Sequence, residues 1–172
     1  MQDFGHAQLV EAEAIGEPGK RVFRLRVMSG RQTASLKMEK EQLVALTVGI
    51  RKLLEQAGES ETAEPAPDPP AGEFPQDAEL EFTIGRLGIG YEEASHMLVI
   101  FAYTLEDAEE DATPAFSCQI SRDQSRVFAE RAEEVVSGGR PICVLCGTSI
   151  DPDGHKCLRR NGSGQRPVPL QE

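Results

Sequence analysis

The sequence predicts an α+β protein in which tandem βββα repeats form one or two antiparallel sheets with two helices, followed by a small zinc knuckle at the C-terminus. Three observations predict this fold. Apolar and polar residues alternate in several short segments, an apolar stripe of helical period follows each group of segments, and a proline-rich stretch separates the two groups. The predicted boundaries are 1–56 for the first unit, 57–79 for a flexible linker, 80–139 for the second unit and 140–172 for the tail.

The first unit contains three strand-like segments, 9–14, 21–28 and 33–38. In the second segment Phe23 and Leu25 fall on one side and Arg24 on the other, a period of two that is typical of a strand with one buried face. The apolar residues that follow recur at steps of three and four, which predicts one buried stripe on a helix of about five turns. The stripe consists of Leu43, Leu46, Ile50, Leu53 and Ala57.

The second unit repeats this order, with strand-like segments at 80–91, 96–105 and 115–120. Alternation in the first segment changes phase around Gly85, which predicts a β-bulge there. A helix is expected after Ser121, because Ser121 and Gln124 have the spacing of a capping box. Its predicted apolar stripe is Phe128, Ala132 and Val135, and its predicted end is Gly138–Gly139.

The two halves also align without gaps at an offset of 82 residues, with residues 34–54 over residues 116–136. Ser35 then meets Ser117, and Gln42 meets Gln124. The repeated order of elements indicates a tandem duplication. The identities are few, so chance similarity of two amphipathic helices is the open alternative. The simplest assemblies are an antiparallel sheet with both helices on one face, or two sheets with pseudo-twofold symmetry.

The chain is acidic, with a net charge of −11, and its charge is uneven. Residues 57–79 hold five prolines and many acids but almost no large apolar side chains, so burial cannot offset the entropy of ordering them. Beyond Gly139, five basic residues accompany three acids, whereas the body before it carries 13 basic and 26 acidic residues. Such a body repels nucleic acid and anionic membranes, so we do not expect either as a partner.

The sequence lacks the marks of a membrane or secreted protein. No apolar run is long enough to span a bilayer, and the N-terminus has neither the basic start nor the apolar core of a signal peptide. We therefore expect a cytoplasmic protein. Thiols stay reduced in the cytoplasm, which favours metal binding or reactivity over disulfides for clustered cysteines.

Residues 142–162, ICVLCGTSIDPDGHKCLRRNG, gather three of the four cysteines and one of the three histidines. Three thiolates and one imidazole have the number and type of ligands that a closed tetrahedral zinc site needs. Gly147 permits a tight turn after the second cysteine, and residues 151–154 have the composition of a type I turn that returns the chain. We therefore predict one structural Zn²⁺ bound by Cys143, Cys146, His155 and Cys157.

Two other interpretations of this cluster stay open. A redox-active cysteine pair usually begins a helix in a βαβ context, and the preceding half of this chain is predicted to be antiparallel. The second alternative is a set of unligated thiols or a disulfide. A catalytic zinc ion is disfavoured, because four protein ligands leave no open position for water or substrate.

Residues outside the cluster give weaker signals. Arg159, Arg160 and Asn161 closely follow the last ligand and could contact an anion or a carboxylate of a partner, although a solvated basic tail is the simpler interpretation. Cys118, on a predicted strand, is expected to be a buried and inert thiol. His96 is expected at the surface or at a sheet edge. The sequence has no phosphate-binding loop and no nucleophile elbow, so we assign no catalytic residue.

The segments GEPGKRVFRL, SLKMEKEQ and GGRPICVLCGTSIDPDGHKCLRRNG resemble an uncharacterised bacterial family, the domain-of-unknown-function family 3090, which is typical of actinobacteria. The resemblance covers residues 1–162, and its most specific part is the tail signature C-x-L-C-G…D-P-x-G-H-x-C-x-R-x-N-G. It implies no activity. Many members carry proline at the positions of Val144 and Leu158, a departure that affects the stiffness of turns rather than ligation.

These observations favour a zinc-containing binding or adaptor module with a protein partner over an enzyme. Zinc would order a tail that has too few apolar residues to fold without it. The alternative is an enzyme or small-molecule-binding protein with a site in the cleft between the two units, which a deep pocket with converging charged side chains would favour. A third alternative, nucleic-acid binding through the tail, conflicts with the acidic body.

Overall fold

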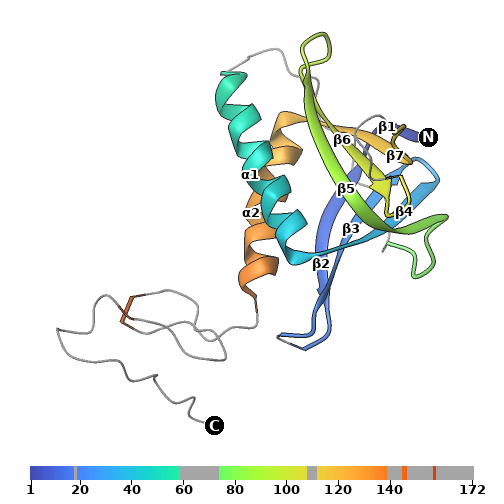
Figure 1. The fold of residues 1–172 in the computed structure, drawn as a ribbon. Helices are drawn as coiled ribbons and strands as arrows, with labels where there is room; N and C mark the ends of the chain where they lie inside the picture. The colour runs from blue at the N-terminus through green and yellow to red at the C-terminus, as the bar shows by residue number, and fades with distance from the viewer. Residues whose placement is uncertain (18, 59–73, 108–111, 139–144, 147–156, 158–172) are drawn as a thin grey trace.

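The computed structural model describes residues 1–17, 19–58, 74–107, 112–138, 145–146 and 157 (Figure 1). Strands and helices within these residues follow the predicted order closely, with one additional strand at the N-terminus. The elements are β1 (Gln2–His6), β2 (Leu9–Ile15), β3 (Val22–Ser29), β4 (Gln32–Met38), α1 (Lys40–Gln56), β5 (Leu80–Glu92), β6 (Met97–Thr104), β7 (Phe116–Ile120) and α2 (Arg122–Ser137).

Within the described residues the strands form one mixed sheet in the order β1-β7-β6-β5-β4-β3-β2. Four neighbouring pairs are antiparallel, but β4 pairs with β5 in parallel, and so does β1 with β7. The expectation of a purely antiparallel sheet is therefore wrong at these two places. The reason at β4–β5 is topological, because α1 lies between the two strands in the chain and such a crossover brings the second strand back in parallel.

The two edges of the sheet meet at residues 7–8, so that the sheet curves back on itself. The Ala7 N–H donates to the carbonyl oxygen of Gln119 beside β1, and the next N–H, of Gln8, donates to that of Met28 beside β2, both at 2.8 Å. The chain thus leaves β7 at one edge and joins β3 at the other. β5 makes the same change of partner, since residues 80–83 pair with β4 and the rest of the strand pairs with β6.

A glutamine at the third position of each helix donates a hydrogen bond to the backbone at the place where the chain changes its strand partner. The Gln124 side chain donates from Nε2 to the carbonyl oxygen of Ala7 at 2.8 Å. In the other half, Gln42 Nε2 lies 3.2 Å from the carbonyl oxygens of both Ile84 and Gly85. Each glutamine also completes the capping box of its helix, as the spacing predicted for α2.

The core lies between the sheet and the two helices, which lie side by side on one face of the sheet (Figure 1). The predicted stripes are confirmed: their central residues are buried, and Leu53 and Val135 pack against the core while partly buried. An ion pair between Arg51 and Glu133 also joins the helices, but both side chains are about half exposed, so its contribution to stability is small. The buried apolar residues of the helices are Leu43, Leu46, Ile50, Phe128, Ala129 and Ala132.

The predicted bulge is confirmed in β5, where the pairing with β6 shifts between Ile84 and Arg86. Gly85 lies at this shift, and a Cβ atom there would overlap the carbonyl oxygen of Thr104. Glycine is therefore required because the backbones of β5 and β6 approach too closely for a side chain.

Candidate functional site

β2 presents two different faces, because successive side chains of a strand point to opposite sides. Val10, Ala12 and Ala14 are partly buried and pack against the core. Glu11 and Glu13 alternate with them and therefore lie on the opposite face. The sequence thus makes one side of this strand small and apolar and the other acidic.

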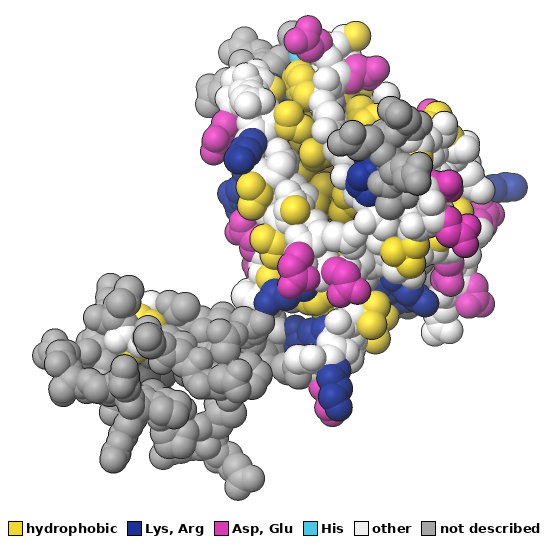
Figure 2. Space-filling model, in the orientation of Figure 1, with side chains coloured by type: hydrophobic (Ala, Val, Ile, Leu, Met, Phe, Trp, Pro, Cys, Tyr) yellow, Lys and Arg dark blue, Asp and Glu magenta, His cyan; other side chains and the backbone are white. Residues whose placement is uncertain are grey.

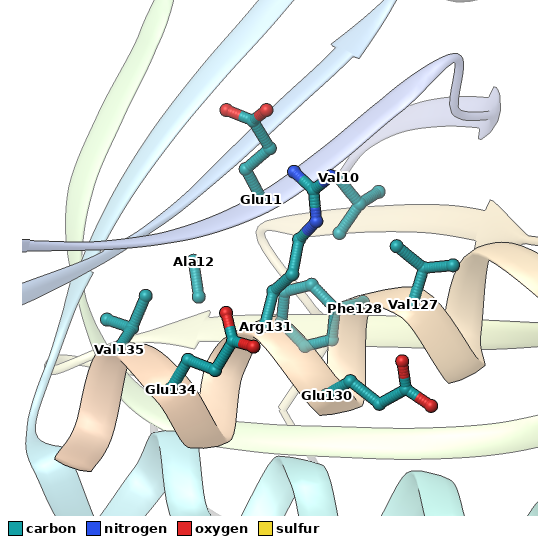
Figure 3. Close-up of a pocket in the computed structure, with 9 residues that line it drawn as sticks. All are labelled: Val10, Glu11, Ala12, Val127, Phe128, Glu130, Arg131, Glu134 and Val135. Carbon is teal, nitrogen blue, oxygen red and sulfur yellow. The ribbon is translucent and has the colours of Figure 1, made fainter. Parts of the chain in front are cut away.

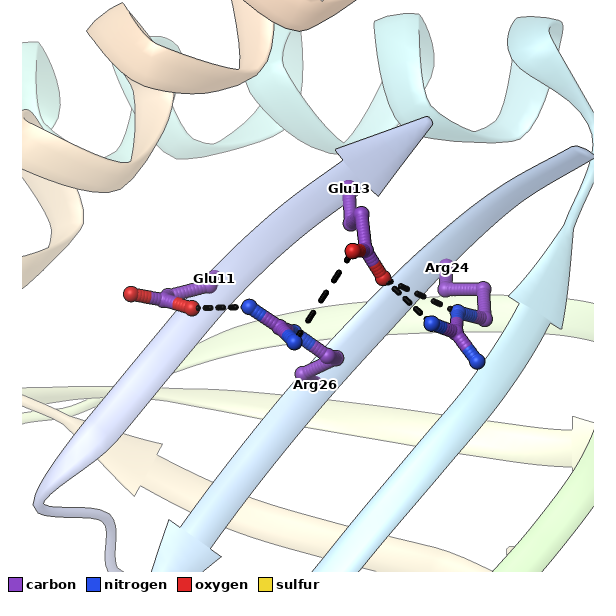
Figure 4. Close-up of polar contacts among 4 residues, drawn as sticks. All are labelled: Glu11, Glu13, Arg24 and Arg26. Carbon is purple, nitrogen blue, oxygen red and sulfur yellow. Dashed lines mark hydrogen bonds and ion pairs between the residues drawn. The ribbon is translucent and has the colours of Figure 1, made fainter. Parts of the chain in front are cut away.

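The acidic face of β2 is held to β3 by a ladder of ion pairs (Figure 4). Glu11 accepts a hydrogen bond from Arg26 at 2.7 Å, and Glu13 accepts from Arg24 at 2.5 and 3.1 Å. These pairs match the backbone register, in which Glu11 lies opposite Arg26 and Glu13 opposite Arg24. Each pair contributes on the order of 1 kcal/mol or less because the side chains are partly exposed, so the pairs add to the backbone ladder that sets the register of β2 on β3.

β2 also borders a groove of about 630 Å³ between itself and α2, and residues of both its faces reach this groove (Figure 3). The groove is open to solvent and combines apolar and charged side chains. It joins the two halves of the chain, since β2 belongs to the first unit and α2 to the second. The lining residues are Val10, Glu11, Ala12, Val127, Phe128, Glu130, Arg131, Glu134 and Val135.

The floor of this β2–α2 groove is apolar, and its α2 rim is charged. Phe128 is only 2% exposed and forms part of the core, whereas Val127 is 49% exposed at the margin. Glu130, Arg131 and Glu134 are exposed on the helix, and Figure 3 shows the Arg131 side chain reaching from α2 towards β2. The groove therefore offers both an apolar surface and charged groups to whatever enters it.

A second helix–strand contact lies between α1 and β5, and it differs from the β2–α2 groove in the size of its side chains. The inward side chains of β5 are large, and a Cβ atom at Gly49 of α1 would lie 3.2 Å from Cγ2 of Ile89. Apolar side chains are visible between α1 and β5 in Figure 2. At the offset of 82 residues, Gly49 corresponds to Arg131. The α1 contact thus has a glycine against a large apolar residue, where the β2–α2 groove has an arginine and small residues.

Two of the four predicted zinc ligands, Cys146 and Cys157, are among the described residues, and both are partly buried. Cys143 and His155 lie outside the described residues, and so do the predicted contact residues Arg159, Arg160 and Asn161. Among the residues that are described, no three His, Cys, Asp or Glu side chains come together as metal ligands. The zinc site therefore stays a prediction from sequence.

Cys118 is a buried thiol with no exposed surface, as its place on β7 predicted. Burial raises the pKa of the Cys118 thiol above its ordinary value, and the nearby Asp3 carboxylate raises it further. The thiol is therefore neutral at physiological pH and is a poor nucleophile. His96 is partly buried in the turn between β5 and β6, where its Nδ1 lies 3.2 Å from the hydroxyl oxygen of Tyr91.

The groove residues were not predicted as a site. Phe128 and Val135 were recognised as parts of an apolar stripe, but the sequence places the strand and the helix of the groove more than 100 residues apart. The available signal was the small size of the inward residues of β2 compared with Leu87, Ile89 and Tyr91 of β5.

The helices among the described residues are too short or too polar to cross a membrane. A family model described as "Protein of unknown function (DUF3090)" matches residues 2–157. No curated protein and no solved structure matches the chain. The family match covers every element of the fold and ends at the last predicted zinc ligand, Cys157. The chain therefore belongs to the DUF3090 family of proteins of unknown function.

Proposed function

We propose that this protein is a cytoplasmic binding module that recognises a protein partner through the β2–α2 groove and does not act as an enzyme there. The observation that carries the proposal is the lining of the groove. Among the described residues it offers apolar side chains, three carboxylates and one guanidinium, but no serine, threonine, cysteine, histidine or lysine. Such a lining can bind a ligand by burial and charge, but it offers no hydroxyl, thiol, imidazole or amine as a nucleophile.

Two exposed valines on the helices allow a matched test of this surface. Val127 is 49% exposed and lines the groove, whereas Val44 is 41% exposed on α1 and does not. Substitution of either by lysine should leave the fold intact, because neither side chain is buried. A partner recovered from the native host and then purified should bind the wild type and Val44→Lys equally, and Val127→Lys about tenfold more weakly. Equal affinity for all three proteins would exclude the groove as the binding site.

We also propose that Cys143, Cys146, His155 and Cys157 hold one structural zinc ion. The donor set supports this, because three thiolates and one imidazole suit tetrahedral Zn²⁺ and fill its coordination. A reducing compartment keeps such thiols available as ligands. The ion would order the tail and hold Arg159, Arg160 and Asn161 in a fixed position for contact with the body or a partner.

Metal analysis of the purified chain tests the zinc proposal. We expect one zinc ion per chain in the wild type and a large loss of zinc in Cys146→Ser. Cys118→Ala is the matched control, because this thiol is buried in the sheet and should not affect zinc content. A wild-type preparation without zinc after growth in zinc-containing medium would contradict the proposal. Circular dichroism of Cys146→Ser should retain the signal of the body, since the tail follows α2 in the chain.

We further propose that the two halves arose by tandem duplication. Two features support it. The two parallel strand pairs correspond, because Gln2 lies opposite Phe116 and Leu80 lies opposite Ala34. The two capping glutamines also donate to the backbone at corresponding places in the two halves. Positions 34 and 116 are separated by the same 82 residues as the two glutamines. Distant relatives whose halves align with each other more closely would support the duplication. Halves that resemble each other least in the earliest-branching relatives would contradict it.

The second candidate function is binding of a small molecule in the same groove. Its position between the two halves favours this candidate, because ligand sites commonly lie between structural units. A thermal-shift screen of metabolites distinguishes the two candidates. A compound that stabilises the wild type but not Val127→Lys would favour the small-molecule function, whereas a groove-dependent protein partner without such a compound would favour the adaptor.

A further inference from the structure

We propose that the β2–α2 groove takes an extended, positively charged segment of a partner protein, which adds as a strand to the free edge of β2. This inference rests on the proposed function and specifies the chemistry of the partner. Strand addition beside a helix is a recurrent mode of peptide recognition, in which backbone hydrogen bonds give affinity and pockets for alternate side chains give specificity.

β2 is the last strand of the sheet, and its other edge has no strand partner within the described residues. Near residues 7–8 the sheet edges are joined, and the β2–α2 groove runs along the rest of β2, with α2 on its other side. In an antiparallel pair, alternate residues direct their N–H and C=O groups away from the partner strand. The seven residues of β2 therefore present a row of backbone donors and acceptors along about 23 Å.

Side-chain sizes at the groove leave room for the alternate residues of such a segment. Val10 and Ala12 of β2 lie opposite Phe128 across the floor. At the α1–β5 contact, by comparison, Ile89 comes so close to the helix that only glycine fits at position 49 without displacing it. The β2–α2 groove lacks such a large side chain on its strand, and its volume is open to an incoming apolar residue.

The α2 rim carries one net negative charge, which favours a basic segment. Glu130 and Glu134 are one helical turn apart on the exposed rim, with Arg131 between them, so the rim carries an excess of negative charge. Glu11 adds a third carboxylate to the lining, although Arg26 neutralises it. The net charge of −11 on the whole chain attracts a cationic segment at long range and repels an acidic one.

The test uses the full-length chain as bait for a displayed library of random dodecapeptides. We expect enrichment of sequences in which apolar residues alternate with lysine or arginine and proline is absent from the centre. The enriched peptide is then synthesised and titrated by fluorescence polarisation. Val127→Lys should weaken its binding about tenfold or more, Val44→Lys should leave it unchanged, and added salt should weaken it progressively.

Backbone methylation of the peptide distinguishes strand addition from other modes of docking. Two versions are made, with N-methyl groups on alternate amides in one register or the other. Strand addition predicts that one version loses binding about tenfold or more while the other retains it, because only alternate amides face β2. Equal effects of both versions would overturn strand addition.

The remaining outcomes also decide the matter. An absence of enriched peptides, enrichment of acidic peptides, or binding that Val127→Lys and Val44→Lys affect equally would each overturn the inference. These results are separable from the test of the proposed function. A native partner that depends on Val127 but competes with no strand-forming peptide would support the function and reject the peptide inference.

Discussion

Replacement of Gln124 by alanine should destabilise the protein through the junction of the two sheet edges. Gln124 Oε1 accepts from the backbone N–H of Ser121 at 2.9 Å, and its Nε2 donates to the carbonyl oxygen of Ala7 at 2.8 Å. Ser121 is 3% exposed and Ala7 is fully buried, so water cannot readily replace either bond. The substitution therefore removes two buried hydrogen bonds with one side chain.

The magnitude follows from these two bonds. Each hydrogen bond contributes about 0.5–1.5 kcal/mol, and the buried groups left without their partner add to the cost. Alanine recovers a few tenths of a kcal/mol of helix propensity. We expect a loss of about 2 kcal/mol in the free energy of unfolding, or roughly 4–8 °C in Tm for a chain of this size. Gln42→Ala should cost about half as much, because its contacts are 3.2 Å long and Glu39, its capping partner, is exposed.

Urea unfolding followed by circular dichroism measures these losses. The control is Gln119→Ala, since Gln119 is partly buried but its side chain bonds to the exposed Glu92. The control should change the free energy of unfolding by less than about 0.5 kcal/mol. If Gln124→Ala were as stable as Gln119→Ala, the hydrogen bonds of Gln124 to Ser121 and Ala7 would not contribute measurably to the free energy of unfolding.

Three further predictions concern the bulge, the buried thiol and the groove. Gly85→Ala should destabilise the protein by about 2 kcal/mol or more, because the new Cβ atom would overlap the Thr104 carbonyl oxygen. Gly88→Ala should be far milder, because the nearest atom to a Cβ there, in the Phe101 side chain, lies at 3.6 Å. Similar urea midpoints for the two variants would contradict this. Because burial raises the pKa of Cys118, the folded chain keeps this thiol protonated at a pH where the unfolded chain loses the proton. The free energy of unfolding should therefore fall as the pH rises above about 9. Unfolding midpoints measured across this range should decline less steeply in Cys118→Ala, and equal slopes would count against the linkage. Arg131→Ala should strengthen binding of a cationic groove peptide about threefold by removing a like charge, and weaker binding would show that Arg131 contacts the ligand favourably instead.

The elements of the fold could largely be predicted because their patterns are local. β3 shows a clean period of two, α1 and α2 show apolar stripes, and the Ser121 capping box marks the start of α2. β1 was missed, because its sequence QDFGH has no alternating pattern and its strand conformation depends on pairing with β7. Parallel pairing was missed for the same reason, since it is set by how α1 returns the chain rather than by any short pattern.

The groove could not be predicted as a site because its two sides belong to distant segments. Val10 and Ala12 look like ordinary inward strand residues, and Val127 looks like an ordinary exposed helix residue. Their significance depends on β2 lying beside α2, which follows from the closure of the sheet at residues 7–8. The cysteine cluster shows the opposite case, because its ligands are close in sequence and could be recognised from spacing alone.

The pairing of β1 with β7 also has a consequence for how the protein is made. β1 is synthesised long before the strand beside it, which begins at Phe116. Contacts between such distant segments slow folding, and a strand edge that stays unpaired in the meantime can pair with another chain and aggregate. During translation β1 must therefore stay unpaired with β7 until β7 has emerged from the ribosome. A bulky fusion partner at Met1 would lie next to this β1–β7 pair, which forms late, so a tag there should lower the yield of folded protein.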